Sequence, residues 1–279
     1  MFQEVDFPSD GVKLSGLYSA SSGERAAGIV LAHGFAGAQY PKLRDALADL
    51  GYAVLDFNFR SYGKSGGERG RVVPAEQVDD ISAAIDWLSE RLEVDPERIG
   101  VVGSSLGGSV AIIATARDPR IKVCVAGCPL ANGDAVLRKQ YPTSEAMESF
   151  FKKVEDARRS GTLIGRYEIV HIPEKLRGVL PPGTPMEFTA ETVYGFRDMD
   201  PVDAAKHLGN RPLFLIHAVD DDVVPVEESR ILAKIAGGNC ELVELPEGNH
   251  FIFGMEPCIA QITGWLQRKL PATTAAVRA

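Results

Sequence analysis

Three side chains in this sequence have the types and the order that nucleophilic catalysis requires. Ser105 lies in the stretch Gly-Ser-Ser-Leu-Gly, Asp221 lies in a run of three aspartates, and His250 lies in Gly-Asn-His-Phe. A serine hydroxyl is a poor nucleophile, so a neutral imidazole must accept its proton. A carboxylate must then hold that imidazole in one tautomer and stabilise its cation. The three residues therefore predict acyl transfer through a serine nucleophile.

The stretch around Ser105 has the pattern of a strand, a tight turn and a helix. An apolar run at 99–102 precedes the turn, and a run of small residues at 108–116 follows it. A serine at the tip of such a turn has a strained backbone that exposes its hydroxyl. Gly103 and Gly107 leave room where side chains would collide with the neighbouring strand and helix. A glycine-rich turn without chemistry fits the same short pattern, so the hypothesis depends on the partners of Ser105.

The two partners follow later strands. Apolar runs at 212–217 and 240–245 predict strands, and Asp221 and His250 come in the loops directly after them. Loops at the carboxyl ends of parallel strands meet at one edge of the sheet, where ligands usually bind. The order serine, acid, histidine along the chain is the order used by one large group of hydrolases. We therefore expect these side chains to meet in space.

Strand and helix signals alternate over most of the chain. Two segments of alternating polarity, 2–7 and 12–19, predict an antiparallel hairpin. Alternating buried strands and helices predict a parallel sheet covered on both faces. The fold class is therefore α/β, a mostly parallel sheet that begins with an antiparallel hairpin. The further expected strands are 27–32, 52–57, 99–102, 121–126, 212–217 and 240–245, and the expected helices are 41–50, 75–92, 203–208, 227–236 and 257–270.

The alternation stops between residues 130 and 205, where 141–160 looks helical and 165–172 looks extended. A long excursion between two strands indicates an inserted cap or lid over the sheet edge. The predicted organisation is a core in two parts, 1–129 and 206–279, interrupted by a cap at 130–205. Six aromatic side chains of the cap either line an acyl site or hold the cap on the sheet. They are Phe150, Phe151, Tyr167, Phe188, Tyr194 and Phe196.

Taken together, these features resemble the α/β-hydrolase fold, and the chain is most similar to small intracellular serine esterases and peptidase-like hydrolases. The resemblance implies an oxyanion hole made by two backbone N–H groups, those of Phe35 and Leu106. The position after Arg60 is often glycine in relatives and is Ser61 here. The motifs that carry the resemblance are His33-Gly34, Arg60…Gly63…Ser65-Gly66, Gly103-Ser104-Ser105-Leu106-Gly107, Asp221-Asp222-Val223-Val224-Pro225 and Gly248-Asn249-His250-Phe251.

The triad acid is one of three consecutive aspartates. Like charges this close raise one another's pKa, so the three cannot all point inward. The resemblance places the acid immediately before x-x-Val-Pro, with two residues between them, which selects Asp221, with Asp220 and Asp222 as the alternatives. His33 is expected to shape its loop, and His217 to lie in the core or beside the triad.

Composition excludes several classes of partner. The chain has 38 acidic and 30 basic residues, a net charge of −8. This charge argues against nucleic acid or an anionic membrane as the main partner. No apolar run approaches the roughly 20 residues that span a bilayer. The first eight residues contain acids and no apolar segment, so no secretory signal and a cytoplasmic location are predicted.

The cysteines and glycine-rich turns predict neither a metal nor a cofactor. The cysteines lack paired Cys-x-x-Cys spacing and have no histidine cluster nearby, so zinc is not expected. Free thiols are predicted, with a bridge between the first two cysteines as the alternative. The turn before Ser105 lacks the spacing and the lysine of a phosphate loop. The four cysteines are Cys124, Cys128, Cys240 and Cys258.

The sequence therefore predicts a cofactor-free serine hydrolase that cleaves carboxylic esters of a small-molecule acyl substrate. Peptidase or amidase, thioesterase and carbon–carbon hydrolase activities use the same residues and stay as alternatives. A non-catalytic binding protein of the same fold is less favoured, because such proteins usually lack a triad residue and none is missing here. Nothing in the sequence specifies an oligomeric state.

Overall fold

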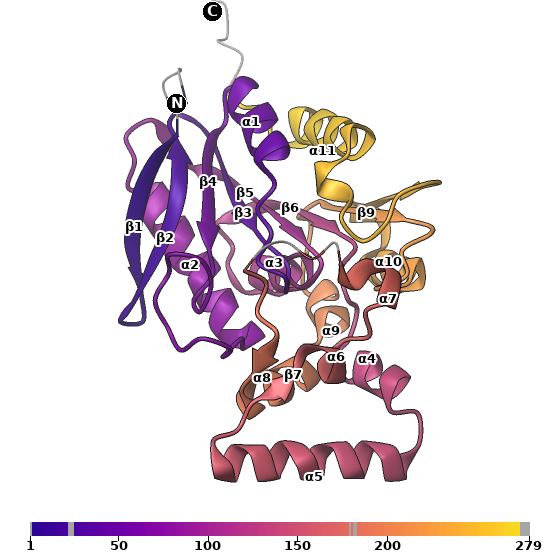
Figure 1. Ribbon diagram of the computed structural model, residues 1–279. Helices are drawn as coiled ribbons and strands as arrows, with labels where there is room; N and C mark the ends of the chain where they lie inside the picture. Colours follow the sequence, from indigo (N-terminus) through magenta and orange to yellow (C-terminus); the bar gives the residue numbers. More distant parts are fainter. Residues whose placement is uncertain (1, 22–24, 179, 181–182, 274–279) are drawn as a thin grey trace, which may run out of the picture.

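The computed structural model describes residues 2–21, 25–178, 180 and 183–273. The predicted core ranges 1–129 and 206–279 and the predicted cap range 130–205 each include a few residues outside the described part. At its centre is an eight-stranded sheet of order β1-β2-β4-β3-β5-β6-β9-β10 (Figure 1). The first two pairings, β1 with β2 and β2 with β4, are antiparallel, and the remaining pairings are parallel. The strands are β1 (Gln3–Ser9), β2 (Val12–Ser19), β3 (Ala26–Ala32), β4 (Ala53–Asn58), β5 (Val94–Ser104), β6 (Ile121–Gly127), β9 (Leu213–Ala218) and β10 (Cys240–Leu245).

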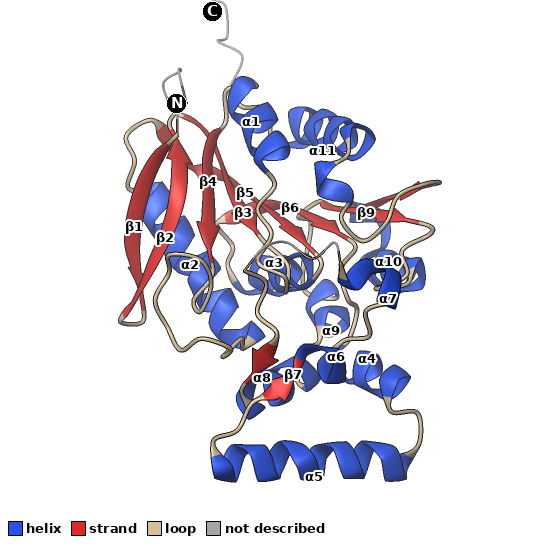
Figure 2. Ribbon diagram, in the orientation of Figure 1, coloured by secondary structure: helices blue, strands red, loops and turns tan. Residues whose placement is uncertain are grey.

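Helices cover both faces of the sheet, which confirms the predicted fold class (Figure 2). Because neither face of the central strands meets water, every residue of β3 is buried. Along the described part of the chain, every helix is too short or too polar to cross a membrane. One face carries α2 (Pro74–Ser89), α3 (Leu106–Arg117) and α10 (Val226–Ala236), and the other carries α1 (Pro41–Asp49) and α11 (Glu256–Lys269).

Between β6 and β9 the chain leaves the sheet and forms several short elements and the 17-residue helix α5, which lies farthest from the sheet (Figure 1). The last of these helices, α9, packs on α3 and α10 of the core. The division into a core and a cap at 130–205 stays a prediction. The elements are α4 (Gly133–Gln140), α5 (Ser144–Ser160), β7 (Ile164–Gly165), α6 (Arg166–Ile169), α7 (Glu174–Arg177), β8 (Glu187–Phe188), α8 (Ala190–Arg197) and α9 (Pro201–Ala205).

One part of the cap contradicts the sequence prediction. Residues 165–172 were expected to be extended, but only Ile164–Gly165 form a strand, and the helix α6 follows immediately. The Gly165 N–H donates to the Glu168 carboxylate at 3.2 Å, which closes a helical turn. Glutamate three residues after a helix N-cap is a capping signal, and the apolar alternation of this segment obscured it.

Candidate active site

Ser105 lies where β5 ends and α3 begins, in the strained backbone conformation that the pattern predicts. Its φ is 54° and its ψ is −125°, a region that L-residues rarely adopt. The flanking glycines are required by close backbone approach. A Cβ on Gly103 would lie 2.2 Å from the Gly107 carbonyl oxygen, and one on Gly107 would lie 2.3 Å from that of Ala32. The turn therefore holds the Ser105 hydroxyl clear of its own helix.

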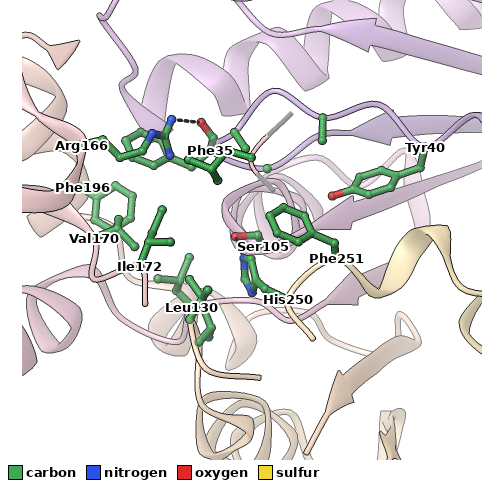
Figure 3. A pocket seen from close by; sticks show the side chains of 16 residues that line it. Phe35, Tyr40, Ser105, Leu130, Arg166, Val170, Ile172, Phe196, His250 and Phe251 are labelled. Carbon is green, nitrogen blue, oxygen red and sulfur yellow. Dashed lines mark hydrogen bonds between the residues drawn. The ribbon is translucent and has the colours of Figure 1, made fainter. Parts of the chain in front are cut away.

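The structure brings the three predicted side chains together in one hydrogen-bonded row. The Nε2 atom of His250 lies 2.8 Å from the Oγ of Ser105, and its Nδ1 lies 2.8 Å from Oδ2 of Asp221. Figure 3 shows the His250 ring directed at Ser105 along the wall of a pocket. Because the carboxylate accepts at Nδ1, that nitrogen carries the proton and Nε2 is free to accept the hydroxyl proton. This is the geometry that general-base activation of a serine requires.

Of the three consecutive aspartates, only Asp221 faces His250. Asp220 and Asp222 are exposed, and Asp222 pairs with Lys175. The second carboxylate oxygen of Asp221 accepts from the N–H groups of Val223 and Val224 at 2.8 and 2.9 Å. Burial by itself would raise the pKa of Asp221, but hydrogen bonds from both neighbouring histidines and from Val224 hold it well below its usual range. The carboxylate is therefore charged at neutral pH.

His217 lies directly behind this carboxylate, as the sequence predicted. Its Nε2 lies 2.8 Å from the Val224 carbonyl oxygen and 3.4 Å from Asp221 Oδ2, both of which only accept. Nε2 therefore carries the proton, and Nδ1 accepts from the Ser229 hydroxyl at 2.7 Å. Sequence reasoning missed Ser229, which sits in helix α10 with no motif around it.

Two backbone N–H groups lie beside the serine. Leu106 is the first residue of α3, so its N–H has no acceptor within the helix. Phe35 follows β3, and among the described residues no backbone carbonyl accepts from its N–H. A Cβ on Gly34 would lie 3.6 Å from Ser105 Oγ, so this loop runs in contact with the hydroxyl. Both donors are thus available at the site.

The side chain of His33 holds this loop in place. Its Nε2 accepts from the Phe59 N–H at 3.1 Å, and its Nδ1 donates to the Gly34 carbonyl at 2.9 Å. Burial lowers the pKa of His33 to about 4, so the ring is neutral and suits this pair of bonds. Nearby, Ser61 has a φ of 73°, which explains why relatives often carry glycine at that position.

A mainly apolar pocket opens beside the triad (Figure 3). The volume of the pocket that a water-sized molecule can occupy is about 40 Å³, room for roughly three water molecules. Of the six cap aromatics, which were expected either to line an acyl site or to hold the cap, Phe196 is the one that lines this pocket among the described residues. Some of these others hold the cap together, since Phe150 stacks on Tyr141 at 4.2 Å. The apolar lining includes Phe35, Leu130, Val170, Ile172, Leu180, Phe196, Val223 and Val224.

The four cysteines are free thiols, as predicted. Cys128 is buried beside the triad, and its sulfur and the ligand atoms of Asp221 and His250 lie within 4.8 Å of one another, so these three could hold a metal ion. Burial and the nearby Asp221 charge raise the pKa of Cys128 well above its ordinary value, which keeps the thiol protonated and a poor ligand. Asp221 and His250 also form a hydrogen bond with each other, which occupies the atoms that would bind a metal. The expectation of no metal stays a prediction.

Comparison with known proteins places this fold among the α/β-hydrolases. The chain belongs to the family described as serine aminopeptidase, S33, whose profile matches residues 23–257. An uncharacterised 31.7 kDa Escherichia coli protein from the traX-finO intergenic region is 30% identical over 238 residues, covering 80% of this chain and 82% of that protein. The thiohydrolase aneE of Aspergillus aculeatus is 28% identical over 280 residues, covering 89% of this chain and 86% of that protein. The structure of DcsB in complex with its substrate analogue shares the fold, with a TM-score of 0.84, 19% identity and coverage of 97% and 99%.

Proposed function

We propose that this hydrolase is a serine hydrolase that cleaves carboxylic esters through an acyl-enzyme intermediate, with no cofactor or metal. The observation that carries the proposal is the unbroken row of hydrogen bonds from Ser105 through His250 to Asp221, at 2.8 Å each. A half-buried hydroxyl that lines a pocket on a strained turn, a base and a buried charged acid are the parts that acyl transfer needs. They lie at the mouth of an apolar pocket suited to a small-molecule acyl group.

In this mechanism Ser105 Oγ attacks the ester carbonyl while His250 Nε2 takes its proton. Asp221 stabilises the imidazolium that forms, because its carboxylate is buried beside Nδ1 and stays charged. The N–H groups of Phe35 and Leu106 donate to the oxyanion of the tetrahedral intermediate. His250 then protonates the leaving alcohol, the acyl group stays on Ser105, and water repeats the cycle to release the acid.

The composition of the pocket favours an ester over the free amino end of a peptide. An aminopeptidase must accommodate the ammonium group of its substrate, which calls for a carboxylate or several carbonyl oxygens. Among the described residues that line the pocket there is no Asp or Glu, and its one permanently charged side chain is Arg166. A cation in the wall repels an ammonium group, so an acyl chain without one fits better.

A thioester is the second candidate substrate, and the observation that favours it is the similarity to a thiohydrolase along most of the chain. The same triad and the same oxyanion donors serve both bonds, since only the leaving group differs. Matched oxygen and sulfur esters of one acyl chain separate the two. The cytoplasmic location expected from the sequence is part of the proposal.

The test is labelling and turnover by the Ser105→Ala variant beside Ser104→Ala. Ser104 is the matched control, because it lies on the same turn and its hydroxyl accepts a hydrogen bond from Tyr40 at 3.2 Å. We expect Ser105→Ala to lose fluorophosphonate labelling and to lower kcat on p-nitrophenyl esters by about 10⁴-fold or more, while Ser104→Ala keeps both. The small pocket predicts an optimum at short acyl chains, and EDTA is expected to leave the rate unchanged. Undiminished labelling of Ser105→Ala contradicts the proposal.

A further inference from the structure

The loop at 34–37, which carries the Phe35 N–H, is held from outside by the cap. Arg166 Nη2 donates to the Phe35 carbonyl oxygen at 2.9 Å, and Figure 3 shows this bond across the pocket wall. The Tyr62 hydroxyl donates to the same oxygen at 2.9 Å. The Phe35 ring stacks on Phe188 of the cap, with ring centroids 4.5 Å apart. One residue of the loop is therefore fixed at its carbonyl and at its side chain.

Arg166 makes its contacts almost entirely with this loop and with cap backbone. Its side chain is buried, its guanidinium lies 4.4 Å from the centre of the Phe35 ring, and Nε donates to the Pro185 carbonyl at 2.7 Å. None of the described carboxylates interacts with it, and burial lowers its pKa to about 10, so it is still charged at neutral pH. A buried guanidinium without an acid is costly unless its donors have a structural use.

The stereochemistry of Phe35 links these contacts to the oxyanion site. Its ring and its carbonyl fix two substituents of the tetrahedral Cα, and with them the position of the amide nitrogen; the direction of the N–H then depends on where Gly34 lies. On the other side, Gly34 is pressed against Ser105, where an added Cβ would lie 3.0 Å from the serine Cβ. An oxyanion donor is effective only when it is already aimed, because reorientation during the reaction forfeits its advantage.

We propose that Arg166 is a positioning residue that clamps Phe35 so that its N–H faces the oxyanion, which makes turnover depend on a docked cap. The proposal rests on the serine-hydrolase function proposed above. The clamp acts on the transition state and not on the bound ester, since the oxyanion exists only after attack by Ser105.

The test compares Arg166→Met with Arg197→Met. Arg197 is the matched control, because its guanidinium also lies over aromatic rings of the cap, those of Phe151 and Tyr194, at 5.3 and 5.4 Å. We expect Arg166→Met to lower kcat about 10- to 50-fold with KM changed less than about twofold, given what small misplacements cost. Affinity for an alkyl boronic acid, which forms a tetrahedral adduct on Ser105, is expected to fall by the same factor. Arg197→Met changes neither.

Two further variants keep the test decisive if Arg166→Met folds poorly. Tyr62→Phe removes the second donor to the same carbonyl oxygen and is expected to lower kcat several-fold without raising KM. Arg166→Lys keeps a cation but not the planar stack, so we expect partial recovery of kcat. A rise in KM at unchanged kcat for Arg166→Met means that Arg166 binds substrate, and that result overturns the clamp.

Hydrogen exchange of peptides covering 33–38 separates failure of the clamp from failure of the proposed function. Faster exchange in Arg166→Met but not in Arg197→Met supports the clamp, and equal exchange overturns it, whether or not any ester is hydrolysed. A wild-type protein that neither turns over esters nor reacts with a fluorophosphonate refutes the proposed function instead. In that case the exchange data still decide whether Arg166 holds the loop.

Discussion

Two buried aspartates show what distinguishes the candidate site from the rest of the core. Asp221 and Asp56 are 7% and 3% exposed, so burial penalises the charge of both carboxylates. The pKa of Asp221 is nevertheless held below its usual range, whereas the pKa of Asp56 is raised to about 7. Both carboxylates are almost completely buried, so the opposite directions of the two pKa shifts come from their partners.

Asp221 is surrounded by donors, and Asp56 is not. The first accepts from two backbone N–H groups and from His250, with His217 close behind. The second, in β4, has an oxygen, Oδ2, with no hydrogen-bond partner among the described residues, and its nearest cation is Arg44 at 3.7 Å. Burial therefore wins at Asp56, and the hydrogen bonds win at Asp221. The comparison predicts that removing the charge of Asp221 lowers activity, whereas removing the charge of Asp56 raises stability above pH 7.

The largest expected effect comes from removing the charge of Asp221 while keeping its shape. In Asp221→Asn the amide can donate to His250 Nδ1, which stabilises the tautomer whose Nε2 carries the proton and cannot accept from Ser105. We expect kcat to fall about 10⁴-fold with little change in KM. Asp222→Asn is the control, since that neighbour is exposed, and it should stay within about twofold. Steady-state hydrolysis of a short p-nitrophenyl ester measures both, and equal losses would refute the assignment of the acid.

The next effect concerns stability and has the opposite sign. Between about pH 4 and pH 7 the folded chain holds a proton on Asp56 that the unfolded chain has lost, because the folded pKa is the higher one. The contribution of Asp56 to the free energy of unfolding therefore falls as pH rises through this window. Asp56→Asn removes the titration and is expected to be more stable than wild type by up to a few kcal/mol at pH 8, and equal or less stable at pH 4.

Urea unfolding from pH 4 to pH 8 tests this prediction by the difference between the two proteins. Asp49→Asn is the control, because Asp49 lies at the end of α1 on the protein surface. Asp221 contributes in the other direction, since its lowered pKa gives stability that is present above about pH 4 and is lost as pH falls. If the free energy of unfolding of the wild type differs from that of Asp56→Asn by the same amount at every pH, the Asp56 carboxylate keeps its charge throughout.

The contrast between these aspartates also explains what the sequence could predict. Asp221 was predicted from the Val224-Pro225 pair that follows it in the motif, and the same motif contains its N–H donors, Val223 and Val224. The alternation of the core was readable for the same reason, since a buried strand or a helix face is a local pattern. Asp56 was hidden, because a single acid within the apolar strand at 53–58 gives no local sign of whether a partner reaches it.

The contacts of the cap were the hardest to predict from the sequence. Arg166 acts on Phe35, which is 131 residues away in the sequence, and no pattern around either residue indicates the contact. The aromatic residues of the cap were visible, but whether each lines the pocket or packs on another ring depends on how short helices fold over one another. Such contacts are decided by tertiary packing, so composition could indicate only the alternatives.

The smallest expected effect sharpens the account of Asp56 by removing its one nearby cation. Arg44 lowers the pKa of Asp56, so Arg44→Met should raise that pKa further above 7. Below about pH 4 the Asp56 carboxyl is neutral in either protein, so the charge of Arg44 does not attract it. Above pH 7 the loss of attraction should cost about 1 kcal/mol of unfolding free energy, because the two charges lie 3.7 Å apart. Arg44 also stacks over Phe2 at 4.4 Å, and the loss of that contact lowers stability equally at all pH values. Arg44 also pairs with Asp45 at 2.9 Å, and that contribution is the same whether or not Asp56 is present. The attraction between Arg44 and Asp56 is therefore the part of the pH-dependent effect of Arg44→Met that is lost in the Asp56→Asn background. An Arg44→Met effect that is equal in the two backgrounds means that the cation does not act on Asp56.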